Sequence, residues 1–366
     1  MVQVFLRSIF GGSQWRLGLL CALAMALAPL PATAAGKTSK TQTVSVPELE
    51  LEGGRKLTYE RAFWSEPEVH IKRGFWTKLI DIVAGAPDFH GLISPYEVAE
   101  DSRGRIIVTD PGAAGIHIFD FEQQKYKFIS RDKDNDGLQV PQCVTVDAAD
   151  NIYVTDSESG KIFVFEPSGK FQRAIGSLKG GEGYFKRPTG IAVDSAAGRI
   201  YVTDTLRNEI FVLDMQGSVL QVIGKKGGEL EFNYPTELRL SGDNLIVVDA
   251  MNFRVVVLDR SGNFRYAIGR IGEGQGEMFR PKGIGVDSEG HLYVVEAVRG
   301  IVQVFDNSGN LLYYFGQKGS GFGEFQLPTG LWIDHNDRVL IVDSYNHRVQ
   351  IFHYFGLAKQ AAGDQR

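Results

Sequence analysis

The chain has only two cysteines, Cys21 and Cys143, in 366 residues. A fold held together by disulfides is therefore excluded, because such folds need several cysteine pairs. Seven histidines are present, but none of them lies at an HExxH or other metal-ligand spacing, and the Gly-x-Ser-x-Gly nucleophile elbow of many hydrolases does not occur. The sequence thus lacks the common catalytic motifs, and we expect its stability to come from packing.

An excess of positive charge is also missing. The 39 Lys and Arg residues are outnumbered by 44 Asp and Glu residues, which gives a formal net charge of -5. Nucleic acid is an unfavourable partner for such a chain, because nucleic-acid binding needs a clustered basic surface.

The apolar run 17–30 has 14 residues, fewer than the roughly 20 that a membrane-spanning helix needs. Arg7 and Arg16 precede the run and small residues follow it, which predicts a signal peptide over residues 1–34 with cleavage after Ala34. The alternative is an uncleaved membrane anchor. Cleavage would remove two arginines and no acids, change the formal charge from -5 to -7, and leave a periplasmic or secreted protein with no transmembrane segment.

Glycine, in contrast, is abundant, with 43 residues, and the sequence repeats itself. One pattern, seen clearly in residues 185–194 and 279–287, occurs six times. Its proline stands at 95, 141, 188, 235, 281 and 328, at intervals of 46 or 47 residues. Such a regular spacing identifies an array of equal structural units.

Each unit contains four short stretches rich in β-branched and aromatic residues, for example 190–193, 199–203, 209–213 and 218–223. The connections between them are too short for crossover helices, so each unit is predicted to be a four-stranded antiparallel sheet. Six such sheets can bury their faces only against one another. The sequence therefore predicts an all-β fold, a six-bladed β-propeller over residues 91–356.

The last unit has only three strands before the chain reaches its tail at 357–366. We expect an N-terminal segment, 57–90, to supply the missing strand, because residues 77–85 resemble the fourth strands of other units. Residues 35–56 are predicted to be a flexible polar lead. A ring closed in this way has few exposed strand edges, so a monomer is expected.

The sixth unit resembles the NHL repeat in its segment 343–352, with Asp343, Asn346, His347 and Arg348. The resemblance extends over about residues 76–356 and implies the six-bladed propeller fold. It leaves function open, because NHL propellers include protein-binding and RNA-binding modules and relatives with lyase activity. Those lyases use histidines around zinc, and no matching set occurs in this sequence.

Two acids recur in the units, and their repetition indicates a structural role. We expect both sets to cap turns by accepting backbone N–H groups. The first set follows the second strand and contains Asp110, Asp156, Asp204, Asp249, Glu296 and Asp343. The second set stands six residues after five of the six prolines and contains Asp101, Asp147, Asp194, Asp287 and Asp334, whereas the fourth unit has Ser241 at this position. Positions where the six units differ are better candidates for function.

The first such position is the loop 132–137 between the first two units. Asp132, Asp134 and Asp136, with the backbone carbonyl of Leu138, could bind Ca²⁺. Cys143 stands where an EF-hand needs a bidentate glutamate, so a solvated acidic turn is the alternative.

The second difference lies two residues after the proline, where three units have glycine and the others have Glu97, Cys143 and Glu237. The first and fourth units are opposite in a six-membered ring. Glu97 and Glu237 should therefore face each other at the channel mouth, near Arg239. They could coordinate a cation or act as acid and base, or they could be solvated rim charges.

The third difference is a set of loop arginines, Arg207, Arg254, Arg299 and Arg348, together with Trp332 on an inner strand. Turns between second and third strands share one face of a propeller with the connections between blades, and we call this the loop face. Other charges of both signs lie on it, so we expect an interaction surface that is mixed in charge.

These observations favour a non-enzymatic exported scaffold that binds a protein, peptide or polysaccharide of the cell envelope on the loop face. The alternative is a metal-dependent lyase or hydrolase that uses Glu97 and Glu237.

Overall fold

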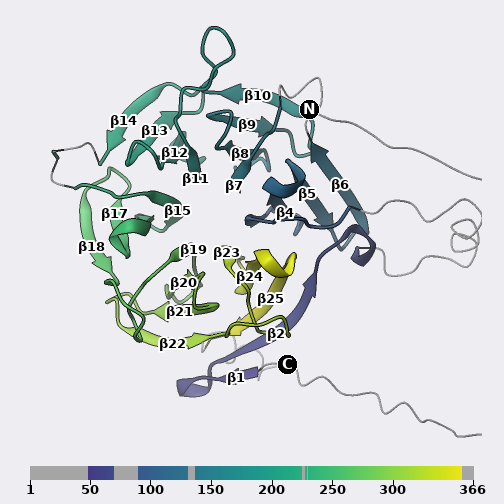
Figure 1. Ribbon diagram of the computed structural model, residues 1–366, viewed down its shortest axis with the longest axis vertical. Coiled ribbons are helices and arrows are strands. Elements are labelled where there is room, and N and C mark those ends of the chain that lie inside the picture. The colour runs from purple at the N-terminus through teal and green to yellow at the C-terminus, as the bar shows by residue number, and fades with distance from the viewer. Residues whose placement is uncertain (1–47, 70–89, 131–136, 225–226, 229, 357–366) are drawn as a thin grey trace, which may run out of the picture. The chain divides into compact units, whose positions relative to one another are not determined.

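The computed structural model describes residues 48–69, 90–130, 137–224, 227–228 and 230–356. Six antiparallel sheets are arranged around a central channel, as the sequence predicts (Figure 1). The first strand of each blade lies at the channel and the fourth lies at the perimeter. The described residues include no helix long and apolar enough to cross a membrane.

The first three blades follow the chain without a crossover. Blade one consists of β3 (Glu97–Glu100), β4 (Ile106–Asp110), β5 (Gly115–Asp120) and β6 (Lys125–Ser130). Blade two consists of β7 (Pro141–Val146), β8 (Ile152–Asp156), β9 (Lys161–Phe165) and β10 (Phe171–Ile175). Blade three consists of β11 (Pro188–Asp194), β12 (Arg199–Asp204), β13 (Glu209–Asp214) and β14 (Val219–Ile223).

Blades four and five repeat this order, and the sixth differs. Blade four consists of β15 (Pro235–Ser241), β16 (Asn244–Asp249), β17 (Arg254–Asp259) and β18 (Phe264–Ile268). Blade five consists of β19 (Pro281–Val286), β20 (Leu292–Glu296), β21 (Ile301–Phe305) and β22 (Leu311–Phe315). Blade six contains β23 (Pro328–Ile333), β24 (Arg338–Asp343) and β25 (Arg348–Phe355), followed outward by the N-terminal strands β2 (Lys56–Phe63) and β1 (Glu48–Glu50).

Short 3-10 turns complete the secondary structure. Three of them connect the second and third strands of blades one, four and six: η3 (Pro111–Ala113), η4 (Ala250–Asn252) and η5 (Ser344–Asn346). Two others, η1 (Glu52–Gly54) and η2 (Glu66–Glu68), lie beside the N-terminal strands.

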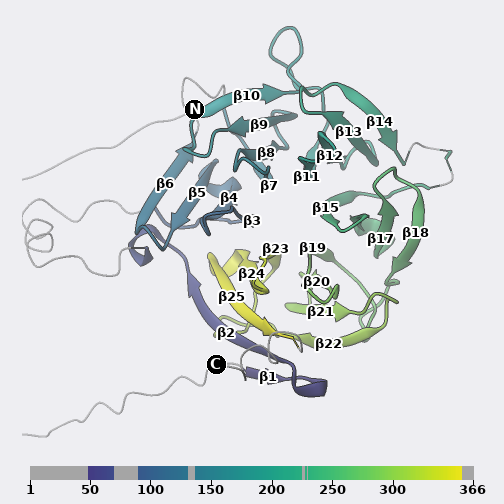
Figure 2. The ribbon, with the colours of Figure 1, turned by 180° about the vertical axis from the view of Figure 1, so that it is seen from behind.

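The closing strand comes from the N-terminal segment, as predicted, but from its beginning, residues 56–63, rather than from residues 77–85. Strand β2 pairs with β25 from Lys56 opposite Phe355 to Phe63 opposite Val349, and so fills the outer position (Figure 2). Residues 77–85 lie outside the described residues. The pairing of β1 with β2 adds a fifth strand and places residues 48–50, which the sequence assigns to a flexible lead, in the sheet.

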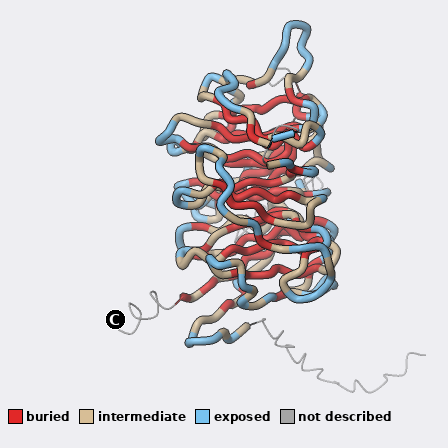
Figure 3. The backbone as a smooth tube through the Cα atoms, turned by 90° about the vertical axis from the view of Figure 1, so that its left-hand side faces the viewer, coloured by how far each residue is buried: buried red, intermediate tan, exposed pale blue. Residues whose placement is uncertain are grey.

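The apolar core is divided among the boundaries between blades. Each of the six buried clusters contains side chains from two neighbouring blades. The strands are mostly buried, whereas the turns that connect them are mostly exposed (Figure 3). At the boundary between blades six and one, Phe63 of β2 packs against Phe119 of β5 with ring centroids 4.8 Å apart. The N-terminal strand is therefore part of the core as well as of the sheet.

The predicted structural role of the repeated acids is confirmed. Asp110 accepts hydrogen bonds from the backbone N–H groups of Ile93 and Ser94, at 2.6 and 2.9 Å, and so fixes the segment before the inner strand. Asp287 accepts from the N–H groups of Glu289 and His291 in the turn after the inner strand. These carboxylates satisfy backbone donors that the strands leave unpaired.

Candidate functional site

The six inner strands bring equivalent residues of each unit to the same level of the channel. The second position after the proline is occupied by Glu97, Cys143, Gly190, Glu237, Gly283 and Gly330. The fourth position is occupied by Ala99, Thr145, Ala192, Arg239, Gly285 and Trp332. The large or polar side chains at these two levels form the centre of the molecule.

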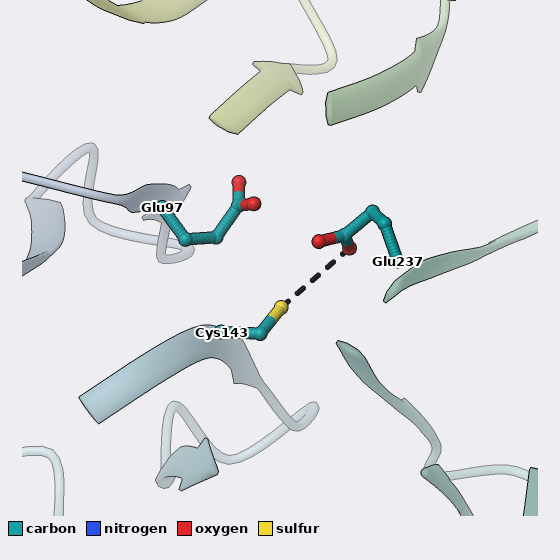
Figure 4. A group of neighbouring side chains, drawn as sticks. All are labelled: Glu97, Cys143 and Glu237. Atoms are coloured by element: carbon teal, nitrogen blue, oxygen red, sulfur yellow. Dashed lines mark hydrogen bonds between the residues drawn. The ribbon is translucent and has the colours of Figure 1, made fainter. Parts of the chain in front are cut away.

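The side chains of Glu97, Cys143 and Glu237 meet in the channel (Figure 4). One carboxylate or thiol atom of each lies within 4.8 Å of the others, and Cys143 Sγ is 3.5 Å from Glu237 Oε1. Only 1% of Glu97, 1% of Cys143 and 4% of Glu237 is exposed. The predicted approach of the two glutamates is confirmed, but the interpretation as solvated rim charges is wrong because both are buried.

Arg239 supplies a positive charge to this group, which we call the channel cluster: Glu97, Cys143, Glu237 and Arg239. Its Nη2 lies 2.9 Å from Glu97 Oε1, and its Nη1 lies 2.8 Å from Glu237 Oε1 and 3.8 Å from Cys143 Sγ. The guanidinium carbon is 5.3 Å from the ring centroid of Trp332. Arg239 therefore bridges blades one and four across the channel, with Trp332 of blade six beside it.

Burial sets the protonation of the channel cluster. It raises the pKa of the Glu97 carboxyl well above its usual value, the nearby Glu237 carboxylate adds to the increase, and Arg239 opposes it. Burial likewise raises the pKa of the Cys143 thiol, again helped by the two glutamates. For Arg239, burial alone would lower the pKa, but Glu237 and Glu97 raise it above the ordinary value. Burial and the neighbouring carboxylates thus favour the neutral forms of the Glu97 carboxyl and the Cys143 thiol, while the glutamates favour the charged form of Arg239.

Glycine at two of the second positions allows this close approach. A Cβ atom on Gly330 would lie 2.6 Å from Glu97 Oε1, and one on Gly190 would lie 2.8 Å from the Cα of Glu237. Either contact is shorter than carbon and oxygen atoms tolerate, so a larger residue would displace the glutamates. The glycines at the second position of three blades thus leave the space that Glu97, Cys143 and Glu237 of the other three blades occupy.

Two carboxylates and a thiol could bind a transition metal. In this arrangement, however, the Arg239 guanidinium already lies among the three donors and supplies the compensating charge. A second group, Glu100, Asp334 and His335, lies where β3 and β23 end away from the loop face. Arg338 similarly bridges its two carboxylates, at 2.5 Å from Glu100 and 2.9 Å from Asp334. Both groups are compensated by an arginine.

The loop arginines named from the sequence contact the loops of their own blades. Arg348 Nε lies 2.8 Å from Asp343, and Nη2 donates to the carbonyl groups of Gly321 and Glu324. Arg254 similarly contacts Asp249 and the Glu231 carbonyl, Arg207 contacts Asp204 and the Tyr184 carbonyl, and Arg299 donates to the Gly274 carbonyl. These bonds attach the connection between blades to the turn after the second strand.

The predicted calcium ligands Asp132, Asp134 and Asp136 lie outside the described residues. Leu138, whose carbonyl completes the predicted set, is fully buried in the cluster between blades one and two.

A pocket of about 340 Å³ lies at the channel mouth on the loop face, and the sequence interpretation did not identify it. We call it the mouth pocket. Its polar floor comes from the first residue after the prolines of five blades: Tyr96, Gln142, Thr189, Thr236 and Lys282. Its rim includes Arg187, Tyr234, Met251, Phe253, Phe279 and Arg280. The sequence did contain a signal for this pocket: the residues directly before and after the repeated prolines differ from unit to unit, and they come together at the channel mouth.

Tyr234 holds an unusual backbone conformation at this rim. Its φ is 57°, in the left-handed region that non-glycine residues seldom adopt, and Pro235 follows it. The Tyr234 N–H group donates a hydrogen bond to the Asn208 side chain at 2.9 Å, and the Tyr234 carbonyl accepts one from the Ala250 N–H group. Tyr234 is 38% exposed. The fold thus fixes a partly exposed tyrosine at the pocket.

Two family models match the sequence. One, described as a 6-bladed beta-propeller, matches residues 134–223 and 228–303, and the NHL repeat model matches residues 325–352. No curated protein matches the sequence significantly.

Many solved structures are similar in fold. Virginiamycin B lyase from Staphylococcus aureus aligns with a TM-score of 0.52 and 16% identity, over 71% of this chain and 94% of that one. An auxiliary nutrient binding protein from Bacteroides thetaiotaomicron aligns with a TM-score of 0.58 and 12% identity, over 73% and 70% of the two chains. Hydrazine synthase of Kuenenia stuttgartiensis aligns with a TM-score of 0.53 and 13% identity, over 72% of this chain and 96% of that one. At these identities the similarity concerns the fold alone.

Proposed function

We propose that this chain, a six-bladed β-propeller of the NHL-repeat type, is a non-enzymatic recognition scaffold that binds its partner on the loop face around the channel mouth. The observation that carries the proposal is the set of large apolar side chains exposed there. Its members lie in connections between blades or in turns between second and third strands: Ile93, Leu206, Tyr234, Met251, Phe279, Leu327 and Tyr345. Three of them, Tyr234, Met251 and Phe279, line the mouth pocket, and exposed apolar side chains beside a pocket are typical of an interaction site.

The state of the channel cluster supports recognition rather than chemistry. A general base must be accessible and partly ionised, and a nucleophilic thiol must be deprotonated. Glu97 and Cys143 are 1% exposed, and burial raises the pKa of both groups. We therefore assign the channel cluster to holding the six inner strands in position beneath the loop face.

Export is part of the proposal. Residues 1–34 have the composition of a signal peptide, and the partner is then a protein, peptide or polysaccharide of the cell envelope. Fusing residues 1–40 to a reporter that is active only outside the cytoplasm tests this. Reporter activity is expected, and its loss when charged residues interrupt the run 17–30 would show that the run acts as the signal.

Affinity capture from the native envelope tests loop-face recognition. The mature protein should retain a partner that Phe279→Ser/Tyr345→Ser, 40% and 61% exposed in the native protein, no longer retains. A matched control, Leu220→Ser/Phe264→Ser, removes side chains of similar exposure, 56% and 54%, from the outer strands β14 and β18. Equal capture by all three proteins would overturn the assignment to the loop face.

The second candidate function is a metal-dependent lyase or hydrolase at the channel. The observation in its favour is that donor atoms of Glu97, Cys143 and Glu237 lie within 4.8 Å of one another. Metal analysis of the purified protein separates the candidates. A stoichiometric transition metal that is lost in Glu97→Gln/Glu237→Gln would favour the enzyme, and binding of metal by both proteins alike would set it aside.

A further inference from the structure

The mouth pocket differs in charge from the rest of the molecule. Its lining contains Arg187, Arg280 and Lys282 and no aspartate or glutamate. The whole chain, by contrast, has more acidic than basic residues, 44 against 39. Three cations without a carboxylate around one pocket are an arrangement that attracts anions.

The two arginines of the pocket are also free to bind. Arg187 and Arg280 are exposed, and only their backbone groups make bonds within the described part of the chain, to Asp204 and Glu296 among others. The loop arginines Arg207, Arg254 and Arg348, in contrast, are each bonded to an acid of the fold. The pocket arginines are therefore not explained by the architecture of the blades.

Lys282 is held toward the pocket by an aromatic ring. Its Nζ lies 5.4 Å from the ring centroid of Tyr96 and 3.4 Å from the Tyr96 hydroxyl. A cation–π contact fixes the position of an ammonium group without neutralising its charge. Lys282 thus adds a third positive charge to the pocket.

The carboxyl groups beneath the pocket do not cancel these charges. Glu97 and Glu237 directly follow Tyr96 and Thr236 in the chain, but both are bonded to Arg239 and buried. Thr236 Oγ1, at the floor, is a buried hydroxyl with no hydrogen-bond partner among the described residues. The lining of the pocket therefore keeps its positive charge.

One wall of the pocket is aromatic. The rings of Phe253 and Phe279 are stacked at 25° with centroids 6.3 Å apart, and 40% of Phe279 is exposed. Tyr234 and Met251, each 38% exposed, lie on the same rim. Such a surface favours an apolar or planar group beside the bound charge.

We propose that the mouth pocket binds an organic anion, with a carboxylate or phosphate near Arg187, Arg280 and Lys282 and an apolar group against Phe253 and Phe279. The volume of about 340 Å³ lies within the usual range for small-molecule sites. The inference deepens the proposed loop-face recognition and rests on it, because it names the chemistry of the group that the face recognises.

Titration with three small probes tests the inference. The probes are 3-phenylpropionate, phenyl phosphate and the neutral 3-phenylpropanamide, added to the mature protein at concentrations up to the order of 10 mM and followed by NMR. At least one anionic probe should bind, and the amide should not. Arg187→Gln/Arg280→Gln should weaken anion binding by about tenfold or more, since charge-assisted hydrogen bonds are lost. Arg265→Gln, which changes an exposed arginine on the outer strand β18, is the matched control and should bind normally.

Each outcome of the titration either supports or overturns anion binding in the mouth pocket. Binding of 3-phenylpropionate alone identifies a carboxylate ligand, and binding of phenyl phosphate alone identifies a phosphate. Binding of the amide as strongly as the acid, no binding of either anion, or equal binding by the double variant and Arg265→Gln would overturn the inference. Loop-face capture remains a separate measurement, because it can be made with Arg187→Gln/Arg280→Gln, which keeps Phe279 and Tyr345: capture that persists when anion binding fails would leave the loop-face proposal standing.

Discussion

Arg239 is the residue on which the charge balance of the channel depends. It contacts both glutamates and the thiol, and it is 8% exposed. Removing one partner of a buried ion pair leaves the other charge without compensation, which is more costly than removing the whole pair. Arg239 should therefore contribute more to stability than a surface arginine does.

We expect Arg239→Leu to lower the free energy of unfolding by about 3–5 kcal/mol, because Glu237 is left buried without its cation. Urea denaturation of residues 35–366 measures the change. Adding Glu237→Gln to the variant should recover part of the loss, because the uncompensated charge is then gone. If the double variant is no more stable than Arg239→Leu, lost packing rather than charge would explain the effect.

The sequence predicted the meeting of Glu97 and Glu237 but not their burial. Their meeting follows from the repeat, because equal positions in opposite blades face each other. Burial depends on how completely the channel is filled, and here Arg239 and Trp332 fill it from the next level while glycines bring the strands close. The repeat predicts where each residue lies around the ring, but it does not predict how completely the residues at two levels fill the channel together.

At the scale of elements, the junction between the first and last blades has its own ionic contact. Glu100 of β3 is bonded to Arg338 of β24, which also binds Asp334. Glu100 is only 7% exposed, and burial raises its pKa to about 7 despite Arg338. The folded protein therefore keeps this proton at pH values at which the unfolded chain has lost it.

This difference predicts a dependence of stability on pH. Between about pH 4.5 and 7 the folded state binds more protons than the unfolded state, so the contribution of Glu100 to stability falls as the pH rises. Relative to Glu100→Gln, the wild type should lose up to about 3 kcal/mol across this window. Urea denaturation at several pH values measures the difference. Glu122→Gln, an exposed glutamate near the same junction, is the control, and parallel curves for wild type and Glu100→Gln would contradict the prediction.

The closing element shows why one strand was misassigned. Residues 77–85 end in glycine like the fourth strands of the repeats, whereas β2 has no such ending and contains a register shift between Tyr59 and Arg61. The shift breaks simple alternation, although Leu57, Tyr59 and Phe63 are all buried. That a strand is missing could be inferred by counting the strands of the sixth unit. Which N-terminal residues supply it depends on side-chain contacts with blades five and one, which the local sequence does not show.

For the whole molecule, the six apolar clusters make each blade dependent on its neighbours. No described blade has a core of its own, so stability arises from the interfaces between units. Strand β2 completes two of these interfaces, since Leu57 and Tyr59 pack with blade five and Phe63 packs with blade one. The ring should therefore unfold as one unit only while β2 is present.

Truncation at two positions tests this dependence. A chain of residues 56–366 loses β1 but keeps β2, and it should retain a single cooperative melting transition close to that of residues 35–366. A chain of residues 64–366 loses the buried side chains of Leu57, Tyr59 and Phe63, each worth about 2–5 kcal/mol, and exposes the edge of β25. Its melting temperature should fall strongly, and it should associate as concentration rises, because an unpaired edge can pair with another chain. Calorimetry and sedimentation at two concentrations measure both effects. An unchanged transition in residues 64–366 would show that the ring holds without its N-terminal strand.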